Sequence, residues 1–387
     1  MPDVDTIRAF LDDRHVAFAS ALDGFARAEL RRRPEPSDDA AARVEARAVL
    51  EILGAGDWLA PIRTRDLRSI ALAREAIAAS SPLADAVYAL QALGATPILL
   101  AGHEAARARW VDAAVSGRAM GGFAMTEPEA GSDVASMTTT ARRDGGDWVL
   151  DGEKSFISNA GIADFYTVFA QTDPNAGSKG IACFVVSSET PGLAFAGAQV
   201  LSSPHPLGRI RLDGCRIPAD ACLAGAGGGF KLGLATLDQL RATVGAAACG
   251  MASRALEEAL AHALDRRQFG EPLAQFQLVR EKLARMATEL AASRLLVYRA
   301  AWVKDRGAER VTLESAMAKA YATEAAQRIV DDAVQILGGR GVLADHPVDR
   351  LYRSVRALRI YEGTTEIQHL VIAGQLLARA REARDPS

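Results

Sequence analysis

The sequence is poor in the residues that build zinc sites and disulfide frameworks. Its 387 residues include four cysteines, Cys183, Cys215, Cys222 and Cys249, and none of them has a Cys-x-x-Cys or Cys/His ligand spacing. This pattern favours neither a structural zinc site nor a disulfide scaffold. The chain is nevertheless long enough to bury a core in one or more domains.

An excess of one charge and long apolar runs are also missing. The chain has 45 basic and 48 acidic residues, so no strong uniform field predicts a nucleic-acid partner. No uninterrupted apolar stretch reaches the roughly 18 residues of a membrane-spanning helix. The first residues, Met-Pro-Asp-Val-Asp, are acidic and do not resemble the basic start of a secretory signal. We therefore expect a cytoplasmic protein that binds neither nucleic acid nor a membrane.

The order of sequence patterns predicts a mainly α-helical protein with a central β domain. Residues 1–120 are rich in alanine and helical in pattern, with a break at Ser81-Pro82. In 121–224, short β-branched and aromatic runs alternate with turns, and Asp144-Gly145-Gly146 is typical of a hairpin. We expect a small barrel or sandwich there. Residues 225–387 contain long helical stretches joined by short loops, which predicts an antiparallel helical bundle.

Caps and prolines indicate where the helices of the third segment begin. We expect Pro272 to open the second long helix, Thr312 to cap a third, and Pro347 to begin a short fourth. Thr365 and Gln368 have the spacing of a capping box, so a last helix should start there.

The segment 359–368 contains the strongest candidate for chemistry. In it, Glu362 lies between an Ile-Tyr pair and Gly363, just before the expected start of the last helix. A carboxylate held among apolar neighbours is partly shielded from water, which raises its proton affinity. A general base for a weakly acidic C–H needs that property. The alternative is a loop glutamate that only caps the helix.

Two segments of the β region offer polar groups to a flat ligand. Residues 123–133 follow an apolar strand with a Gly-Ser turn, whose N–H groups and hydroxyls can bind a heterocycle or a pyrophosphate. In 152–161, Phe156 and Ser158 are two positions apart, so in a strand they share one face. One could stack on a ring while the other hydrogen-bonds to it. The alternative is a core phenylalanine beside a solvated serine.

Together these motifs make the chain resemble the acyl-CoA dehydrogenase family of flavoproteins from about residue 105 to residue 380. The segments concerned are 125–133, 151–159, 266–270, 335–339 and 360–365. The resemblance implies an N-terminal helical domain, a β domain and a C-terminal four-helix bundle. It also implies FAD as the cofactor, and a homotetramer or homodimer in which a neighbouring subunit completes each FAD site.

The resemblance assigns roles to the residues that match the family's motifs. Glu362 matches the base that removes the α-proton of an acyl thioester while hydride leaves Cβ for flavin N5, giving the 2-enoyl thioester. The cofactor-binding positions in the β region are Phe123, Met125, Thr126, Gly131, Ser132, Phe156 and Ser158. The remaining cofactor positions, several of them from the neighbouring subunit, are Arg266, Phe269, Gln277, Gln335, Gly338, Gly339, Thr364 and Glu366. The substrate-binding positions are Ser132, Asp238, Arg241 and Gly363.

The sequence also departs from the family's pattern. The loop 199–209 lacks the family's Arg-x-Ser element and contains two prolines, and Phe156 occupies a position where tryptophan is common. A short, branched, cyclic or carrier-protein-tethered acyl group therefore fits as well as a straight fatty acyl-CoA. His205 and His346 have no second ligand at a metal spacing, and we interpret them as surface loop histidines.

Some alternatives stay open at this point. Asp238 and Arg241 could form only a surface ion pair three residues apart on a helix. The chain could also be a flavin-dependent oxidase or monooxygenase on the same fold, or a helical scaffold without a cofactor. In the leading hypothesis the substrate is an acyl-CoA or an acyl-carrier-protein thioester, and the electron acceptor is an electron-transfer flavoprotein or a similar protein.

Overall fold

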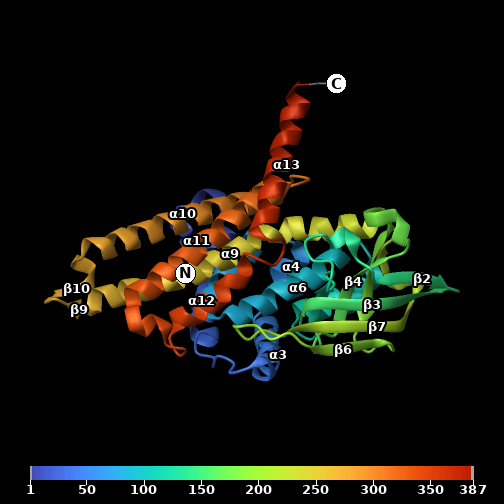
Figure 1. Ribbon diagram of the computed structural model, residues 1–387, viewed down its shortest axis with the longest axis horizontal. Helices are drawn as coiled ribbons and strands as arrows, with labels where there is room; N and C mark the ends of the chain where they lie inside the picture. Colours follow the sequence, from blue (N-terminus) through green and yellow to red (C-terminus); the bar gives the residue numbers. More distant parts are fainter. Residues whose placement is uncertain (1, 385–387) are drawn as a thin grey trace. The chain divides into compact units, whose positions relative to one another are not determined.

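The computed structural model describes residues 2–384, with helices first, strands in the middle and long helices at the end (Figure 1). The predicted fold class, mainly α with a central β domain and a C-terminal helical bundle, is confirmed. The chain forms two compact units, each assembled from separated stretches. Unit 1 comprises the chain up to Arg33, Asp66–Asp85, and the chain from Asp238 onward. Unit 2 comprises Pro34–Arg65 and Ala86–Leu237.

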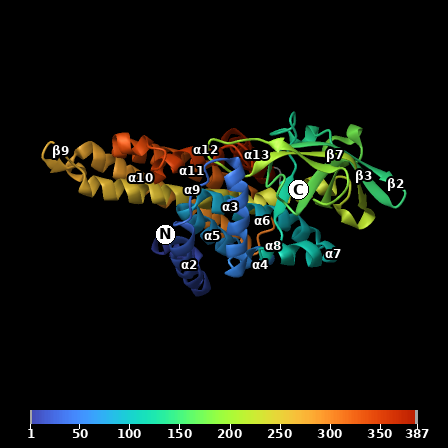
Figure 2. The ribbon, with the colours of Figure 1, turned by 90° about the horizontal axis from the view of Figure 1, so that it is seen from below.

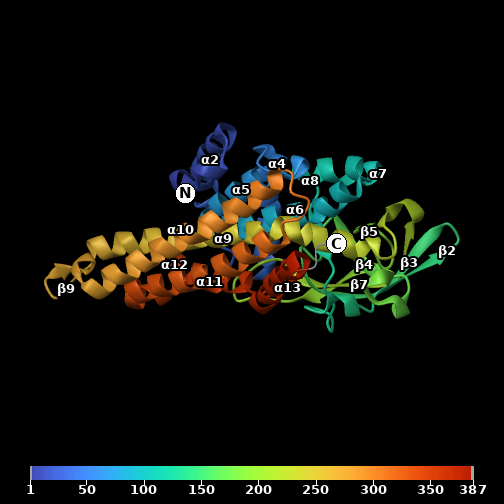
Figure 3. The same ribbon diagram turned by 90° about the horizontal axis from the view of Figure 1, so that it is seen from above.

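Long helices dominate unit 1. They are α9 (Gly228–Asp265), which begins in unit 2, α10 (Gln277–Asp305), α11 (Thr312–Leu337), α12 (Pro347–Leu358) and α13 (Thr365–Arg384). The first three run side by side in every view (Figures 1, 2 and 3), and α13 projects from the bundle in Figure 1. The N-terminal helices of this unit are α1 (Val4–Ile7), α2 (Asp13–Phe25) and α5 (Leu67–Ser80).

Small residues let the helices of unit 1 approach closely. The core of the bundle is rich in buried alanines, such as Ala246 and Ala255 on α9. A Cβ at Gly250 would lie 2.1 Å from the carbonyl oxygen of Glu75, so α9 and α5 touch backbone to backbone at this point. Such close packing produces the tight core that folded domains need.

Two of the expected helix starts differ from the structure. Pro272 does not open α10, because Glu271-Pro272 forms a short strand, β10, that pairs with Arg267-Gln268 (β9). Pro272 itself has an extended ψ of 146°, and α10 begins five residues later. Thr312 is the first residue of α11 but not its cap, because its hydroxyl donates to Asp238 instead. Pro347 does begin α12, as predicted.

One eight-stranded mixed sheet forms the centre of unit 2. Its strands are β1 (Gly121–Ala124), β2 (Thr140–Asp144), β3 (Asp147–Ser158), β4 (Phe165–Gln171), β5 (Ile181–Ser187), β6 (Leu193–Ala198), β7 (Leu207–Pro218) and β8 (Cys222–Ala224). The order is β6-β7-β3-β2-β4-β5-β8, and β1 pairs with β4 in parallel. Every residue of β4 is buried, as expected for a central strand. The predicted hairpin is confirmed, with Gly145 at φ 63° in the turn between β2 and β3.

The helices of unit 2 are shorter, apart from one apolar helix. They include α3 (Asp39–Ala55), α4 (Ala60–Thr64), α7 (Glu104–Ala106) and α8 (Asp112–Val115). Within residues 2–384, α6 (Pro82–Ala101) is the helix long and apolar enough to cross a membrane, and 83% of its apolar window is buried. A core helix of a folded domain has the same properties.

Candidate active site

In unit 1, the loop between α12 and α13 holds Glu362 in a left-handed backbone conformation. The φ angle is 54° at Glu362 and 91° at Gly363. Glycine adopts such a conformation freely, but a residue with a side chain is strained by about 1–3 kcal/mol. Strain of this kind persists only where the surroundings hold the backbone in place.

Three side chains hold this loop by its carbonyl groups. Lys319, fully buried on α11, donates from Nζ to the carbonyl of Gly363 at 2.7 Å. Arg241 on α9 donates from Nε to the carbonyl of Glu362 at 3.3 Å. Gln368 on α13 donates from Nε2 to both oxygens, at 3.2 Å to Glu362 and 3.0 Å to Gly363. The backbone next to the carboxylate is therefore fixed from three different helices.

The prediction that Thr365 and Gln368 form a capping box is wrong. Thr364, not Thr365, caps α13, since its Oγ1 accepts from the N–H of Ile367 at 3.3 Å. The hydroxyl of Thr365 donates to Glu324 at 2.8 Å, and the side chain of Gln368 turns to the loop carbonyls. The cap therefore lies one residue earlier than predicted, and Gln368 holds the Glu362 loop instead of capping the helix.

The carboxyl group of Glu362 is shielded and incompletely satisfied. The residue is half-buried, and Oε2 is out of contact with solvent and has no hydrogen-bond partner within residues 2–384. Burial raises the pKa of Glu362, and the nearby charges of Arg74, Arg241 and Lys319 oppose that rise. Burial also lowers the pKa of Lys319 to about 8. A carboxylate with a free, dry oxygen and a raised pKa is suited to accept a proton.

A buried ion pair next to this loop could not be found from sequence. Arg74 on α5 donates from Nε and Nη2 to the two carboxylate oxygens of Asp85, both at 2.9 Å, and from Nη1 to Thr243 at 3.1 Å. Arg74 and Asp85 are almost fully buried. Both residues lie in alanine-rich stretches, from which the sequence predicts only a helix. Their burial could not be predicted, because the residues that cover them are on helices distant in sequence.

Asp238 and Arg241 form the predicted pair, but not on the surface. Arg241 Nη1 donates to Asp238 Oδ1 at 2.8 Å, and Arg241 is 6% exposed. The hydroxyl of Thr312 donates to the other carboxylate oxygen, and Ser315 donates to the backbone carbonyl of Asp238 at 2.9 Å. Through Arg241 the pair is connected to the loop of Glu362.

In unit 2, the end of β3 presents Phe156 and Ser158. The register of β3 against β7 shifts between Lys154 and Ile157, and Phe156 has a φ of 55° at this bulge. Phe156 is 59% exposed while Ile157 is buried, so the alternative of a core phenylalanine is wrong. Bulges re-aim side chains, and here one leaves an aromatic ring exposed two residues before a half-buried serine.

A buried carboxylate shapes the loop that precedes these residues. Glu127 accepts from Lys154 Nζ at 2.8 Å and from the N–H groups of Thr138 at 2.6 Å and Thr139 at 2.9 Å. Burial alone would raise its pKa, but Lys154 and these donors lower the pKa of Glu127 to about 2. The Ser155 N–H also donates to the Thr126 carbonyl at 2.9 Å. Glu127 and Lys154 thus tie the loop to β3.

His205 lies in a loop, as predicted, but it is half-buried and bonded to its neighbours. Its Nε2 lies 2.8 Å from Ser158 Oγ, and its Nδ1 is shielded from solvent. Burial, with a contribution from Arg43, lowers the pKa of His205 to about 4. The carbonyl of Pro206 accepts from the Asn159 N–H at 2.8 Å, which draws the loop onto the end of β3. By contrast, His346 caps α12, with Nδ1 accepting from Val348.

The other predicted cofactor positions differ in exposure. In unit 2, Gly131 and Ser132 are exposed, Thr126 and Phe123 are half-buried, and Met125 is buried. In unit 1, the exposed positions lie at the β9–β10 hairpin, the start of α10, the end of α11 and the start of α13: Arg266, Phe269, Gln277, Gln335, Gly338, Gly339 and Glu366. Phe269 is 95% exposed. Leu278, near the start of α10, is also 80% exposed.

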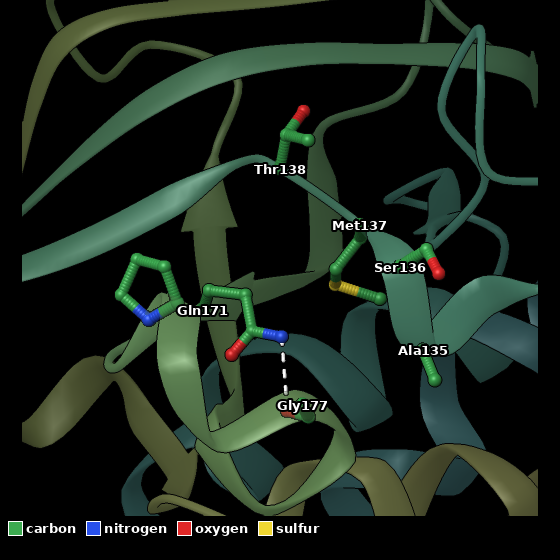
Figure 4. Close-up of a pocket in the computed structure, with 7 residues that line it drawn as sticks. Ala135, Ser136, Met137, Thr138, Gln171 and Gly177 are labelled. Carbon is green, nitrogen blue, oxygen red and sulfur yellow. Dashed lines mark hydrogen bonds between the residues drawn. The ribbon is translucent and has the colours of Figure 1, made fainter.

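A surface cavity of about 370 Å³ in unit 2 lies apart from the predicted positions. Its lining consists of Ala135, Ser136, Met137, Thr138, Gln171, Pro174 and Gly177 (Figure 4). Within it, Gln171 donates from Nε2 to the Gly177 carbonyl at 2.9 Å. None of the predicted site residues lines it.

Comparison with known proteins identifies the family. The acyl-CoA dehydrogenase middle-domain profile matches residues 122–215, and the C-terminal-domain profile matches 227–377. The short-chain specific acyl-CoA dehydrogenase of human mitochondria is 43% identical over 287 residues, 74% of this chain and 69% of that protein. A protein of Mycobacterium leprae named probable acyl-CoA dehydrogenase is 39% identical over 305 residues, 78% of each chain. The chain belongs to the acyl-CoA dehydrogenase family.

Several solved structures share the fold. Butyryl-CoA dehydrogenase from Megasphaera elsdenii is similar with a TM-score of 0.88 and 32% identity, over 95% of this chain and 99% of that one. A structure described as the electron transferring flavoprotein of Acidaminococcus fermentans has a TM-score of 0.87 and 30% identity, over 95% and 98%. The prolyl acyl carrier protein oxidase AnaB has a TM-score of 0.86 and 27% identity, over 95% and 99%.

The residues of this acyl-CoA dehydrogenase family member fit a flavin. An exposed ring at Phe156 and a hydroxyl at Ser158 suit the face and polar edge of a tricyclic heterocycle. The exposed Gly131-Ser132 turn offers small residues where phosphates could approach. Within unit 1, the N-terminus of α13, which begins at Thr365, favours an anion by itself.

Proposed function

We propose that this protein dehydrogenates an acyl-CoA, or an acyl-carrier-protein thioester, to its 2-enoyl thioester with FAD as cofactor. The main support is the carboxyl of Glu362, whose Oε2 is shielded and unpartnered within the described residues. A shielded carboxylate oxygen without a partner is costly, and a role in proton transfer would account for it. The raised pKa of Glu362 matches a base for a weakly acidic C–H.

The residues that would hold FAD are those of the predicted positions. Phe156 would cover one face of the flavin ring, and Thr126 and Ser158 would donate hydrogen bonds to it. Ser132 and Thr364 would lie near the pyrophosphate. When bound, FAD supplies the acceptor for the hydride that leaves Cβ, at flavin N5.

The work of this chain is to orient the substrate and to move one proton. Glu362 would remove the α-proton through Oε2, while its own N–H polarises the thioester carbonyl. Lys319, Arg241 and Gln368 keep that N–H and the carboxylate in register by holding the loop carbonyls. Fixing the base in this way reduces the entropy lost on reaching the transition state.

The rest of the reaction is proposed from the relatives. The names of the human short-chain enzyme and of butyryl-CoA dehydrogenase favour a short acyl group. From the sequence we propose a cytoplasmic protein, and from the family resemblance an electron-transfer flavoprotein or similar protein as electron acceptor. The exposed Phe269 and its neighbours favour a homotetramer or homodimer in which one subunit completes the FAD site of another.

A second candidate is an oxidase reaction on the same fold, with oxygen as the acceptor. The fold of AnaB, named a prolyl acyl carrier protein oxidase, gives it support. Stoichiometric hydrogen peroxide release at each turnover, without an added acceptor, would favour this candidate.

The test uses purified protein loaded with FAD under anaerobic conditions. We expect yellow protein whose flavin absorbance bleaches on addition of short-chain acyl-CoAs, and less so with long-chain ones. A protein that binds FAD but is bleached by no acyl thioester would contradict the proposed dehydrogenation. A colourless protein that takes up no added FAD would support the scaffold alternative instead.

A further inference from the structure

The loop between β6 and β7 grips the end of β3 at several points. Gln199 Oε1 accepts from the Phe156 N–H at 2.7 Å, and Gln199 Nε2 donates to Ser155 Oγ at 3.1 Å. Seven residues later, the Pro206 carbonyl accepts from the Asn159 N–H. Between these contacts, His205 reaches Ser158. The loop therefore fixes both the backbone of the bulge and one of its side chains.

An arginine on α3 binds backbone carbonyls next to the end of β3 and the start of β7. Arg43 on α3 donates from Nη2 to the Leu207 carbonyl at 3.0 Å and also donates to the Ala160 carbonyl. Its guanidinium lies 4.8 Å from the ring centre of Phe195 on β6. One partly buried side chain thus binds the carbonyls of Ala160 and Leu207, on either side of the contact between Ser158 and His205. These bonds hold the backbone on both sides of that contact.

The surroundings of His205 favour the neutral imidazole. Nδ1 is shielded from solvent and has no hydrogen-bond partner in the described part of the chain. Burial lowers the pKa of His205 to about 4, the positive charge of Arg43 acts in the same direction, and Asp39 on the same helix partly offsets that charge. The ring is then uncharged at neutral pH, and one of its two nitrogens carries the proton.

The unpartnered Nδ1 also decides which nitrogen is protonated. A proton on Nδ1 would bury a donor with nothing to accept from it, and orphaned buried donors are rarer than orphaned acceptors. The proton therefore belongs on Nε2, which donates to Ser158 Oγ over 2.8 Å. With its oxygen engaged as an acceptor, Ser158 keeps its own hydroxyl proton free to donate elsewhere.

We propose that His205 is a positioning residue that makes Ser158 a fixed hydrogen-bond donor to the bound flavin. The inference rests on the proposed FAD binding. Nothing in the 199–209 loop predicted it from sequence, because the contact depends on how the loop folds back onto β3. A hydrogen bond donated to the flavin ring stabilises the electron-rich reduced form, so His205 should raise the flavin reduction potential through Ser158.

The experiment measures the reduction potential of the FAD-loaded protein by spectroscopic titration with a reference dye. His205→Ala should lower the equilibrium constant for flavin reduction about tenfold, equivalent to about 30 mV for a two-electron couple. His205→Gln keeps an N–H donor at a similar reach and should restore most of the potential. Ser202→Ala, an exposed position in the same loop, is the matched control and should change nothing.

A double-mutant cycle separates positioning from a general effect of the loop. If His205 acts through Ser158, then His205→Ala should add no further shift in a Ser158→Ala background. Additive shifts, or an unchanged potential in His205→Ala, would overturn the inference. Because the titration uses no acyl thioester, that result leaves the dehydrogenation untouched. Bleaching by acyl-CoA in the parent protein tests the function separately.

Discussion

Glu362 combines a strained backbone with a shielded carboxylate, and two neighbouring cations act on both. Lys319 and Arg241 donate to the loop carbonyls and also act on the carboxyl group through their charge. The loop is thus held by cations that also keep the pKa of the Glu362 carboxyl from rising further. The carboxyl group is shielded from solvent and yet lies near charges that favour its ionised form.

The pH dependence of flavin reduction should report the pKa of Glu362. Because the group must be deprotonated to accept a proton, the rate of anaerobic bleaching should rise with pH. Burial raises the pKa of Glu362, so the inflection should lie above its ordinary value of 4.5. Stopped-flow measurements from pH 4 to pH 9 check this. An inflection at or below 4.5 would show a carboxyl group open to water.

Lys319→Met should move that inflection further upward. The substitution removes a buried cation that lowers the pKa of Glu362, and leaves the Gly363 carbonyl with Gln368 as its remaining side-chain donor. We expect a profile displaced to higher pH and a lower limiting rate. Lys231→Met, at an exposed position of α9, is the control and should leave the profile in place.

The same raised pKa predicts how Glu362 affects stability. The unfolded carboxyl titrates near 4.5 and the folded one higher, so below pH 4.5 both states hold the proton and no penalty arises. As pH rises through the folded pKa, the folded state loses stability relative to the unfolded state. Glu362→Gln should therefore raise the unfolding temperature at pH 8 and change it little at pH 4. Thermal unfolding monitored by circular dichroism measures both.

The sequence predicted that Glu362 lies just before the last helix, because a glycine and a helix start are visible within a few residues. It did not predict how the carboxyl group is surrounded: Ile360 and Tyr361 are 53% and 39% exposed. The charges near the carboxyl group come from other helices. Arg74 and His205 escaped prediction because their partners lie on other elements. Nothing within a turn of either residue reveals Asp85 or Ser158 as a contact.

At the scale of the element, the pair of Glu127 and Lys154 joins a loop to a strand. Lys154→Met would leave a buried carboxylate without its cation, which costs about 3–5 kcal/mol. We expect a lower urea midpoint and weaker FAD binding, since the loop bears Thr126. A more exposed ion pair joins Arg209 on β7 to Glu153, the residue before Lys154 on β3. Arg209→Ala should cost at most about 1 kcal/mol.

Acid should weaken this tie in a defined range. The pKa of Glu127 is lowered to about 2, from an ordinary 4.5. Its contribution to stability is therefore complete above pH 4.5 and is lost as pH falls toward 2. Glu127→Gln should remove that part of the acid sensitivity, which unfolding curves at pH 7 and pH 3 would show. If the parent protein and Glu127→Gln lost equal stability between pH 7 and pH 3, Glu127 would not contribute to the acid sensitivity.

The start of a helix was predicted correctly where it depends on a single residue. It was predicted poorly where it depends on the geometry of the preceding turn. Pro347 fixes φ at a helix start, and α12 begins there. Pro272 carries the same local signal, but pairing with Arg267 recruits it into a short strand. The cap of α13 lies at Thr364 because the left-handed turn at Glu362 and Gly363 sets the chain direction first.

At the scale of the whole molecule, the sequence predicted the order of helical and β segments. It did not predict that each compact unit combines separated stretches, such as Asp66–Asp85 with the bundle helices. That grouping depends on close contacts such as Gly250 against Glu75. A glycine in an alanine-rich helix gives no sign of the partner it will meet.

Assembly can be tested by complementation between two inactive variants. A subunit with Phe269→Ala and Arg266→Glu should fail to complete its neighbour's FAD site, and a Glu362→Gln subunit should lack the base. If the exposed residues act on a neighbouring subunit, co-expressed mixtures should regain part of the activity that neither variant has alone. Mixtures as inactive as the separate variants would show that these residues act within one chain or not at all.

The most direct test of the central claim is the rate of anaerobic flavin bleaching by a short-chain acyl-CoA in Glu362→Gln. The amide keeps the shape and the loop contacts but cannot accept the α-proton. We predict FAD binding unchanged and bleaching slower by about 10²–10⁴-fold, the usual contribution of a general base. Bleaching at the parent rate would contradict the assignment of Glu362 as the base.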